Sequence, residues 1–360
     1  MTAAGKKRVA LVGATGIAGQ QFVVALADHP WFEITRLVGS ERSAGKRYGD
    51  ALRDAKTGAR RWWCESEPPD AVLALGVEDS ATFDPDDVDL VFSAVEADVA
   101  RELEPRYART VPVVSAASAF RYDDDVPIIA PGVNWSHVRL LPLQRERRGW
   151  KGYLTPIPNC ATTGLVIALK PIHDAFGVKK VIVTSMQGIS GAGRSPGVVA
   201  LDIVDNIVPF IPKEEEKVAR ETKKIFATLG EGGLSDADFV VSATCTRASV
   251  IEGHTESVSV SLEKGASPDD IARVMRAFDG GSGYPSAPKR WIVVHDDPYR
   301  PQPRLDRNAE NGMATSVGRI RPEPVLENGV KFVLVSHNTK MGAAAGAVLV
   351  AEHLHREALL

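Results

Sequence analysis

Short apolar runs alternate with amphipathic stretches through the first half of the chain. Residues 17–28 and 97–109 carry apolar positions at helical spacing, which predicts a helix in each. Apolar runs of strand length, bounded by glycine, proline or polar residues, lie at residues 9–12, 32–38, 88–93 and 111–115. Strands that alternate with helices favour a parallel, doubly wound sheet. Residues 53–81 are polar, and we expect them to be peripheral.

The second half has a different pattern. Strand-like runs are farther apart, and residues 255–261 alternate between apolar and polar positions in the way that is typical of a half-buried strand. Further strands are predicted at residues 179–186, 239–243 and 330–336, and helices from residue 160, from 213 to about 229, and over 343–355. Residues 285–307 are rich in proline and basic residues, and we expect an ordered excursion there rather than a separate domain. The pattern predicts a second domain of α+β type.

Composition narrows the class of protein. A chain of 360 residues is too long for one core, so two domains are expected. The net charge of −3 gives no reason to expect nucleic acid or a membrane surface as a partner. Three cysteines without ligand-like spacing argue against disulfides and against a metal site, and they fit the reducing cytoplasm. The basic N-terminus contains no separate apolar signal region, and no run approaches membrane-spanning length.

The first predicted strand ends in a glycine turn that opens a helix. Gly13, Gly16 and Gly19 lie in the order strand, turn, helix, which is the context of a dinucleotide-binding fingerprint of the Rossmann-like kind. Glycines allow the tight turn and let backbone N–H groups approach a pyrophosphate at the helix N-terminus. The spacing GxxGxxG is a variant of the usual motif, and a glycine turn without a ligand is the alternative.

The end of the second strand bears on the choice of cofactor. An enzyme that uses NAD normally places an acidic residue there to bind the ribose hydroxyls. Here the strand is followed by Ser40, Arg42 and Ser43, which suit a 2′-phosphate, although Glu41 lies among them. We therefore predict NADP(H) as the preferred cofactor, with NAD(H) as the alternative. A solvated loop without a ligand would have the same composition.

A cysteine lies at the predicted start of the helix near mid-chain. Pro156 and Pro158 keep the approach extended, Asn159 is a suitable N-cap, and Cys160 falls in the first turn. Unpaired backbone N–H groups and the helix dipole favour a thiolate at that position, and the thiolate is the nucleophilic form. The alternative is a small buried residue at a helix start, because such a cysteine needs a base before it is a nucleophile.

Other chemistry-bearing residues follow predicted strands. Arg121 comes just past a strand, where folds of this kind bind ligands, and a guanidinium suits a phosphate or a carboxylate. Arg247 and His254 are expected at a strand edge or a turn, and His254, which follows a glycine, is expected to be exposed enough to act as a base. A second glycine-rich loop, residues 187–197, either lines a cofactor or substrate or is a long turn. A nucleotide domain with such a Cys–His set suits hydride chemistry on an acyl group through a thioester.

These motifs resemble those of aspartate-semialdehyde dehydrogenases, in the branch found in archaea and fungi. The resemblance spans essentially the whole chain, in the family's order. The segments that carry it are residues 13–19, 115–121, 158–160, 187–193, 214–217 with 221–222, Arg247, 253–256 and 336–339. An asparagine–cysteine pair followed later by Gly253, His254, Thr255 and Glu256 is a specific combination, whereas the nucleotide turn by itself is not.

The resemblance implies roles for individual residues. Cys160 is similar to the nucleophile, His254 to the acid/base and Gln187 to the residue that orients the acyl group. Arg247 resembles the clamp on the substrate α-carboxylate, and Glu214 the partner of the α-amino group. The implied phosphate binders are Arg121, Asn159 and Lys217. The implied cofactor contacts are Gly13, Thr15, Gly16, Ile17, Ala18, Ser40, Arg42, Ser43, Ser93, Ser190, Gly191 and Asn338.

The resemblance also implies a reaction and an organisation. The reaction is reductive dephosphorylation of L-4-aspartyl phosphate to L-aspartate-4-semialdehyde with NADPH, on the route to lysine, threonine and methionine. The small-molecule partners are then the acyl phosphate, the aldehyde and inorganic phosphate, and the enzyme is a cytoplasmic homodimer or homotetramer. An NADP-binding domain of residues 1–157, completed by a C-terminal helix at 340–360, would precede a catalytic and dimerisation domain of residues 158–339.

Two positions depart from the family pattern. Ala161 replaces the usual serine or threonine, and Ala248-Ser249 follows Arg247 where proline is usual. Neither departure removes a charged group or a nucleophile. The rival hypotheses are a malonyl-CoA reductase-like acyl reductase, an N-acetyl-glutamyl-phosphate reductase, and a non-catalytic NADP-binding protein with Cys160 as a redox sensor. Glu214 favours the aspartyl enzyme over malonyl-CoA reductase, which has no amino group to bind.

Overall fold

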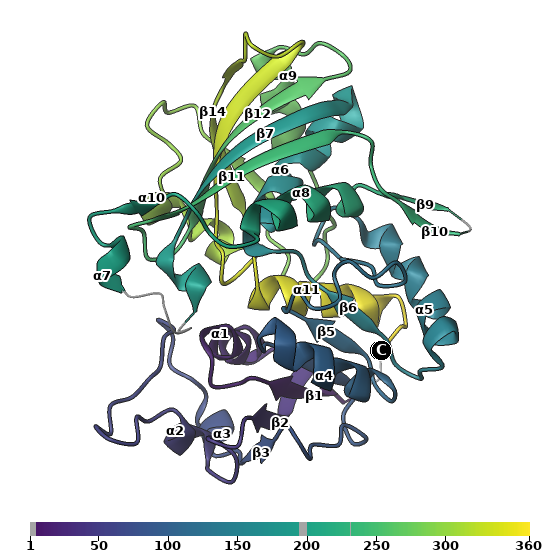
Figure 1. Cartoon of the computed structure of the whole chain (residues 1–360), viewed down its shortest axis with the longest axis vertical. Coiled ribbons are helices and arrows are strands. Elements are labelled where there is room, and N and C mark those ends of the chain that lie inside the picture. The colour runs from purple at the N-terminus through teal and green to yellow at the C-terminus, as the bar shows by residue number, and fades with distance from the viewer. Residues whose placement is uncertain (1–4, 194–199, 231) are drawn as a thin grey trace. The chain divides into compact units, whose positions relative to one another are not determined.

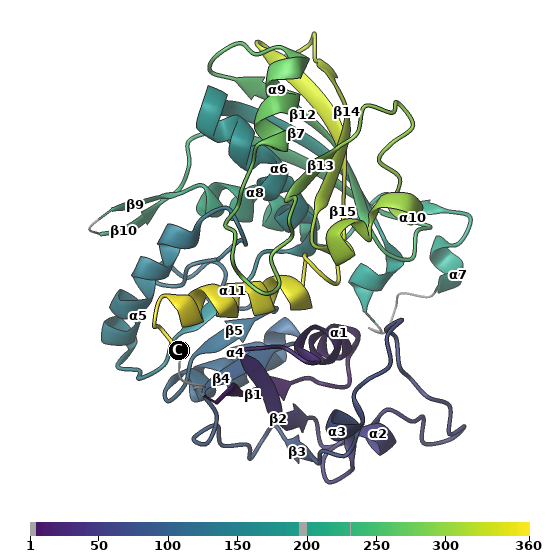
Figure 2. The same cartoon turned by 180° about the vertical axis from the view of Figure 1, so that it is seen from behind.

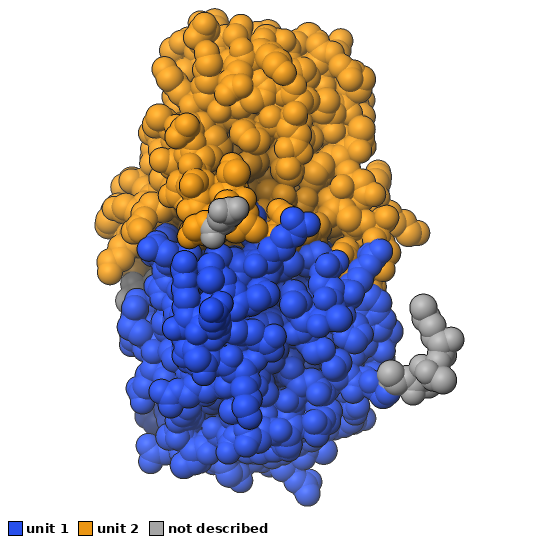
Figure 3. All heavy atoms as spheres, turned by 90° about the vertical axis from the view of Figure 1, so that its right-hand side faces the viewer, with its two compact units in different colours: residues 1–127, 137–157, 347–360 blue, residues 128–136, 158–346 orange. Residues whose placement is uncertain are grey.

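The computed structural model describes residues 5–193, 200–230 and 232–360. The start of the basic N-terminus and residues 194–197 of the predicted second glycine-rich loop lie outside the described residues. The chain divides into two compact units, coloured separately in Figure 3. Unit 1 comprises residues 1–127, 137–157 and 347–360, and unit 2 comprises residues 128–136 and 158–346.

Unit 1 is built on a six-stranded sheet, labelled in Figure 1, with the strand order β3-β2-β1-β4-β5-β6. Every neighbouring pair is parallel, so the predicted Rossmann-like, doubly wound sheet is confirmed. The strands are β1 (Lys7–Val12), β2 (Phe32–Gly39), β3 (Val77–Asp79), β4 (Leu90–Ser93), β5 (Val113–Ser115) and β6 (Leu154–Pro156). The order reverses direction between β1 and β4, and such a switch point is where these sheets bind ligands.

The helices of unit 1 cover this sheet. Helix α1 packs on β1 and β2, and α4 packs on β4, β5 and β6. Their bounds are α1 (Ile17–Leu26) and α4 (Ala97–Ala108), and the shorter elements are α2 (Tyr48–Ala51), α3 (Asp70–Leu73), η1 (Trp135–Leu140) and α5 (Leu141–Arg148). Residues 53–81 are peripheral, as expected, although they include β3, which forms the edge of the sheet. Strand β3 has three residues, of which only Val77 is buried, and so short a strand shows no alternation of apolar and polar positions that could predict it.

Unit 2 contains, within the described residues, a seven-stranded mixed sheet with the order β13-β14-β15-β12-β7-β11-β8. The predicted α+β class is confirmed. The strands are β7 (Val178–Gln187), β8 (Ile207–Val208), β11 (Val240–Ala248), β12 (His254–Leu262), β13 (Ile292–Val294), β14 (Thr315–Pro322) and β15 (Gly329–Ser336). A separate hairpin joins β9 (Thr228–Gly230) and β10 (Gly233–Ser235).

Helix α6 (Cys160–Phe176) packs along the centre of the sheet of unit 2. It contacts β7, β12, β14 and β15, and α8 (Glu214–Ile225) and α9 (Pro268–Arg276) contact it in turn. Figure 2 shows α6 and α9 on the near side of the strands, whereas Figure 1 shows the opposite face of β7, β11 and β12. The remaining short elements are η2 (Ile189–Ala192), α7 (Ala200–Ile203), α10 (Pro303–Asp306) and η3 (Ala309–Gly312), and α11 (Ala344–Arg356) ends the chain.

Two expected element ends in unit 2 need correction. Helix α8 ends at Ile225 rather than near residue 229, because Phe226 leaves the helix and packs edge-on against His173 and Phe239. Strand β11 continues past residue 243 to Ala248, because β7 pairs with it as far as Arg247 and β8 pairs with Arg247 and Ala248. Arg247 therefore lies at the end of a strand, which is one of its two expected placements. The proline-rich segment is an ordered part of unit 2 and not a separate domain, as expected: it contributes β13 and α10 and buries Trp291.

Among the described residues, no helix combines the length and the apolar character that a membrane span requires. The same part of the chain contains no cluster of three or more histidine, cysteine or acidic side chains arranged to hold a metal ion.

Candidate active site

The start of α6 places a thiol at a helix N-terminus. Asn159 is the N-cap, and its side-chain oxygen accepts hydrogen bonds from the backbone N–H groups of Ala161 at 2.9 Å and Thr162 at 3.4 Å. Cys160 is the first helical residue and is partly exposed. The predicted N-cap and helix start are therefore confirmed. The helix dipole and the first-turn N–H groups favour negative charge at this sulfur.

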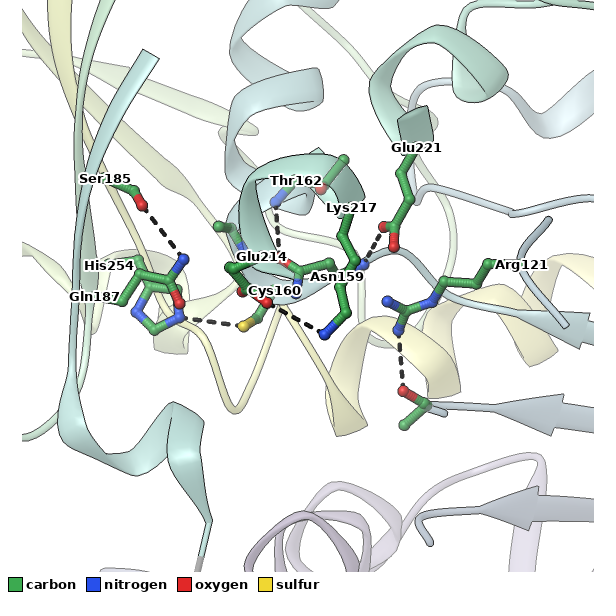
Figure 4. A network of polar contacts seen from close by, with 12 residues as sticks. Arg121, Asn159, Cys160, Thr162, Ser185, Gln187, Glu214, Lys217, Glu221 and His254 are labelled. Carbon is green, nitrogen blue, oxygen red and sulfur yellow. Dashed lines mark hydrogen bonds and ion pairs between the residues drawn. The ribbon is translucent and has the colours of Figure 1, made fainter. Parts of the chain in front are cut away.

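The sulfur of Cys160 lies 3.1 Å from Nε2 of His254 (Figure 4). The other ring nitrogen of His254, Nδ1, accepts a hydrogen bond from the backbone N–H of Gly188 at 3.1 Å. The sequence places these residues 94 positions apart, and the tertiary structure brings them together. A thiol with an imidazole in contact and a third group orienting that imidazole is the usual arrangement of an activated nucleophile.

His254 is buried, with an exposed fraction of 1%, so the expectation of an exposed histidine was wrong. The residue opens β12 and pairs in register with Ser336 of β15, and its ring contacts the Cys160 sulfur and the backbone N–H of Gly188, which follows β7. Burial, with the nearby Arg247 guanidinium and the His337 ring, lowers the pKa of His254 to about 3. The ring is therefore neutral at physiological pH.

Gln187 and Arg247 lie side by side at the ends of β7 and β11. The Gln187 amide donates to the hydroxyl of Ser185 at 3.2 Å, and the Arg247 guanidinium donates to the carbonyl of Gly188 at 2.9 Å. Burial lowers the pKa of Arg247, and the neighbouring Cys160, together with Glu214 and Cys245, opposes that shift. Arg247 stays a cation, because its ordinary pKa is far above neutrality.

Helix α8 brings two carboxylates to the start of α6. Glu214 accepts from the side-chain amide of Asn159 at 2.8 Å and from Lys217 at 3.3 Å. Glu221 accepts from the backbone N–H of Asn159 at 2.6 Å and is fully buried. The sequence motifs contain Glu221 only within the matching segment 221–222, and they indicate no role for it. Its signal was heptad spacing from Glu214, on the face that also buries Val218.

Asn338 links Ser190, in the loop after β7, to Gly253, the residue before His254. Its amide nitrogen donates to the hydroxyl of Ser190 at 2.8 Å, and its oxygen accepts from the N–H of Gly253 at 2.9 Å. A Cβ built on Gly191 would lie 3.0 Å from a guanidinium nitrogen of Arg247 and 3.1 Å from the ring of His254. All the predicted catalytic residues, with Ser190, Gly191 and Asn338, therefore belong to unit 2. No sequence pattern marks the backbone N–H of Gly188, because any residue except proline has that donor.

The predicted cofactor residues of unit 1 lie at the carboxyl ends of its strands. Gly13 has φ +82°, and a Cβ there would be 2.6 Å from the carbonyl oxygen of Ala94. Helix α1 begins after Gly16, which provides no side-chain cap, so its first-turn N–H groups suit a phosphate. The residues of this turn therefore fit a dinucleotide. The neighbouring predicted residues are Thr15, Ile17 and Ala18.

The remaining predicted residues of unit 1 lie at the end of β4 or beyond the ends of β2 and β5. The Ser43 hydroxyl donates to the carbonyl of Ser40 at 3.0 Å, and Arg42 is exposed. Ser93 ends β4 in register with Ser115 of β5. The Arg121 guanidinium donates to the carbonyl of Ala116 at 3.0 Å, and Ala116 is the residue that follows β5. A parallel nucleotide-type sheet together with a thiol–imidazole pair is typical of dehydrogenases that have a nucleophilic cysteine.

Comparison with known proteins identifies the family. Residues 8–141 match the model described as semialdehyde dehydrogenase, NAD binding domain, and residues 169–341 match the semialdehyde dehydrogenase dimerisation domain. The chain is 44% identical to the aspartate-semialdehyde dehydrogenase of Methanothermobacter thermautotrophicus, over 96% of this chain and 97% of that one. It is 40% identical to the enzyme of the same name from Saccharomyces cerevisiae, with 98% of each chain covered.

The structural comparison agrees. The crystal structure of aspartate semialdehyde dehydrogenase with NADP from Candida albicans has a TM-score of 0.87 to this chain at 37% identity, covering 99% of this chain and 100% of that one. The chain is therefore an enzyme of the semialdehyde dehydrogenase family, as its resemblance to the archaeal and fungal aspartate-semialdehyde dehydrogenases indicated.

Proposed function

We propose that the chain catalyses the NADPH-dependent reductive dephosphorylation of L-4-aspartyl phosphate to L-aspartate-4-semialdehyde, through a thioester on Cys160. The observation that carries the proposal is the contact of the Cys160 sulfur with His254 at the N-terminus of α6, beside Arg247 and Glu214. The Candida albicans relative was solved with NADP, and a Vibrio cholerae relative, 26% identical with a TM-score of 0.77, was solved with ASA.

The charges around the sulfur suit this substrate. An aspartyl group carries an α-carboxylate and an α-amino group, so its recognition needs one charge of each sign. Arg247 and Glu214 supply that pair in unit 2, and Gln187 is the proposed orienting residue for the acyl oxygen. For the phosphate we propose Asn159 and Lys217, together with Arg121 of unit 1. A malonyl-CoA substrate has no α-amino group for Glu214 to bind.

The proposed steps keep the bonds balanced. The Cys160 thiolate forms a C–S bond to the acyl carbon, the C–O bond to phosphate breaks, and the leaving phosphate takes a proton from solvent. When bound, NADPH supplies the hydride that reduces the thioester. The hemithioacetal oxyanion on Cys160 then re-forms its C=O bond and expels the thiolate as the aldehyde leaves. His254 is the proposed partner of the sulfur throughout.

We further propose how the units divide this work. Unit 1, with the turn at Gly13 and the residues Ser40, Arg42, Ser43 and Ser93, would hold NADP(H). Unit 2 would carry the chemistry and, through its dimerisation domain, would form a homodimer or a tetramer of such dimers. The product would feed the synthesis of lysine, threonine and methionine.

The test is the reverse reaction. The chain is incubated with L-aspartate-4-semialdehyde, NADP and inorganic phosphate, and in parallel with malonate semialdehyde, NADP and CoA. We expect phosphate-dependent NADPH formation that disappears in Cys160→Ser and persists in Cys64→Ser, a matched thiol removal in unit 1. Turnover only with CoA would assign the chain to malonyl-CoA reduction. No turnover with either pair, despite NADP binding, would favour a redox sensor.

A further inference from the structure

We propose that Tyr48 and Gln20 are positioning residues for the cofactor: each holds one carbonyl of the glycine turn away from the bound pyrophosphate, so that the turn presents N–H groups to it. The inference goes beyond the proposed cofactor contacts, because neither side chain needs to touch the ligand. It rests on the proposed binding of a dinucleotide by unit 1, and it applies to NADP and NAD alike, since both contain a pyrophosphate.

A turn that binds a pyrophosphate has to expose N–H groups and keep carbonyl oxygens away from the ligand. In a trans peptide the C=O and the N–H point in opposite directions, so a hydrogen bond that fixes a carbonyl also fixes the next N–H. Gly13 and Gly16 flank this turn, and glycine restrains the rotation of a peptide less than any other residue does. Other groups therefore have to hold the peptides of the turn.

The Tyr48 hydroxyl holds the peptide between Ala14 and Thr15. It donates to the Ala14 carbonyl at 2.8 Å, and both Tyr48 and Ala14 are fully buried. The N–H of the same peptide belongs to Thr15 and therefore points away from the hydroxyl. Burial, with the nearby Cys64, raises the pKa of Tyr48, so the hydroxyl keeps the proton that it donates.

The Gln20 side chain holds the next peptide of the turn. Its amide nitrogen donates to the carbonyls of Thr15 at 3.0 Å and Arg61 at 2.9 Å, and its oxygen accepts from the backbone N–H of Trp63 at 2.6 Å. Both N–H groups of the amide are used, and two acceptors with one donor define its orientation. Gln20 is fully buried, so residues 61–63 of the peripheral segment support the glycine turn through this amide.

The other two carbonyls of the turn also have donors. The Gly13 carbonyl accepts from the N–H of Gly16 at 3.1 Å, and the Gly16 carbonyl accepts from the backbone N–H of Gln20 at 2.9 Å. Within the described residues, three N–H groups at this end of α1 make no backbone hydrogen bond, those of Thr15, Ile17 and Ala18. Carbonyls that are all bound and N–H groups that are not suit an anionic ligand.

Loss of either side-chain donor leaves a carbonyl oxygen of the turn without its partner. The peptide is then free to rotate towards another donor, and the fraction of chains whose turn is ready to bind pyrophosphate falls. The apparent dissociation constant of the dinucleotide rises as that fraction falls. The reacting groups of unit 2 are unchanged once the cofactor is bound.

Two matched pairs of variants test the positioning role. Tyr48→Phe and Gln20→Leu remove the two donors. Tyr153→Phe is the first control, because the equally buried Tyr153 hydroxyl donates to the carbonyl of Leu359 at 3.1 Å. Gln144→Leu is the second, because its buried amide also donates to two carbonyls and accepts from one backbone N–H. Both controls lie at the amino end of β6, whereas the glycine turn follows the carboxyl end of β1 in the same parallel sheet.

Dissociation constants for NADP and NAD are measured by isothermal titration calorimetry. We expect Tyr48→Phe and Gln20→Leu to raise the constant of the tighter dinucleotide by roughly fivefold to fiftyfold. The controls should leave it within about twofold, although all four variants lose buried hydrogen bonds and should unfold at a lower temperature. In the reverse reaction the KM for the dinucleotide should rise, while kcat at saturation stays within about threefold.

Unchanged constants in Tyr48→Phe and Gln20→Leu, or an equal rise in all four variants, would overturn the inference and leave the proposed reaction intact. If Gln20→Leu does not fold, the comparison of Tyr48→Phe with Tyr153→Phe decides. An unmodified chain that binds neither dinucleotide would contradict the proposed cofactor, and the positioning role with it. Calorimetry needs no turnover, so a chain that binds NADP without acting on the semialdehyde would refute the reaction and still test the turn.

Discussion

Glu104 is a carboxyl group buried in unit 1 beneath the ends of two strands. It lies on α4 and accepts from the Ser115 hydroxyl at 2.5 Å. Burial raises the pKa of Glu104 to about 7, although the hydroxyls of Ser115 and Ser93 and the charge of Arg121 oppose the shift. The same carboxyl therefore lies close to the proposed cofactor residue Ser93 and the proposed phosphate binder Arg121.

This pKa makes stability depend on pH. The folded chain binds the Glu104 proton more tightly than the unfolded chain does, because the pKa rises from 4.5 to about 7 on folding. The resulting contribution is complete below about pH 4.5 and is lost as the pH rises through about 7. Relative to Glu104→Gln, which stays neutral, the unmodified chain should lose roughly 3 kcal/mol of unfolding free energy across that window.

Denaturant unfolding at several pH values measures this difference. Glu102→Gln is the matched control, since the same substitution on the exposed face of the same helix should leave the pH profile unchanged. A Glu104→Gln profile parallel to that of the unmodified chain would show that the carboxyl titrates normally.

At the scale of elements, the position of Cys160 depends on how closely α6 approaches β15. Gly164 lies one turn after the cysteine, and a Cβ there would be 2.6 Å from the Cβ of Ser336. Ser336 pairs in register with His254 across β15 and β12. The absence of a side chain at Gly164 thus allows the helix that carries the thiol to pack against the strands that carry the imidazole.

Gly164→Ala should therefore destabilise the chain and lower its activity. The added methyl group cannot be accommodated without moving α6 away from β15, and overpacking of this kind costs about 1–3 kcal/mol. The better helix propensity of alanine offsets up to about 1 kcal/mol of that. We expect a lower midpoint in thermal unfolding and a lower kcat, while Asp174→Ala, at the exposed end of α6, changes neither. A more stable variant with full activity would show that α6 and β15 leave room for a methyl group at position 164.

The helices and strands that could be predicted from the sequence were mostly those with a clear hydrophobic period. Strand β14 and the capped helix α9 were missed, whereas the apolar strands β1, β2, β7, β12 and β15 and the start of α6 were predicted within two residues, because their signals are local. Strand β3 and the end of α8 were not, because a three-residue edge strand has no period and the packing of Phe226 outweighs helix propensity. The environment of His254 was missed for the same kind of reason, since the groups around it come from β15, from α6 and from Gly188, all distant in the sequence.

At the scale of the whole molecule, one face of the unit 2 sheet is exposed. The side chains that face away from α6 include Ile182 and Val240, with exposed fractions of 47% and 62%, and Thr184, Ser242 and Thr244, which are also exposed. Residues that alternate with them, such as Val183 and Cys245, are buried. An apolar and hydroxyl-bearing face of this kind suits the proposed dimerisation.

Charged side chains introduced on this face should dissociate a homodimer. We expect Ile182→Lys combined with Val240→Lys to shift the mass measured by light scattering from dimer towards monomer, because two unpaired charges would be buried at the interface. Val325→Lys, a substitution at a side chain 86% exposed between β14 and β15, is the control and should leave the mass unchanged. An unchanged mass in the double variant would place the interface elsewhere.

The sequence by itself determined the parallel nucleotide-type sheet, the helix start at Cys160 with its Asn159 cap, and the residue types of the candidate site. These features follow from local rules of periodicity, glycine turns and capping. The tertiary structure alone decided that Cys160 meets His254 across 94 residues, that Glu221 binds the backbone of Asn159, and that Gly188 donates to Nδ1. The physical reason is that the pairing of β7, β12 and β15 and the packing of α6 on them set these distances, and strand register is not a property of any local stretch.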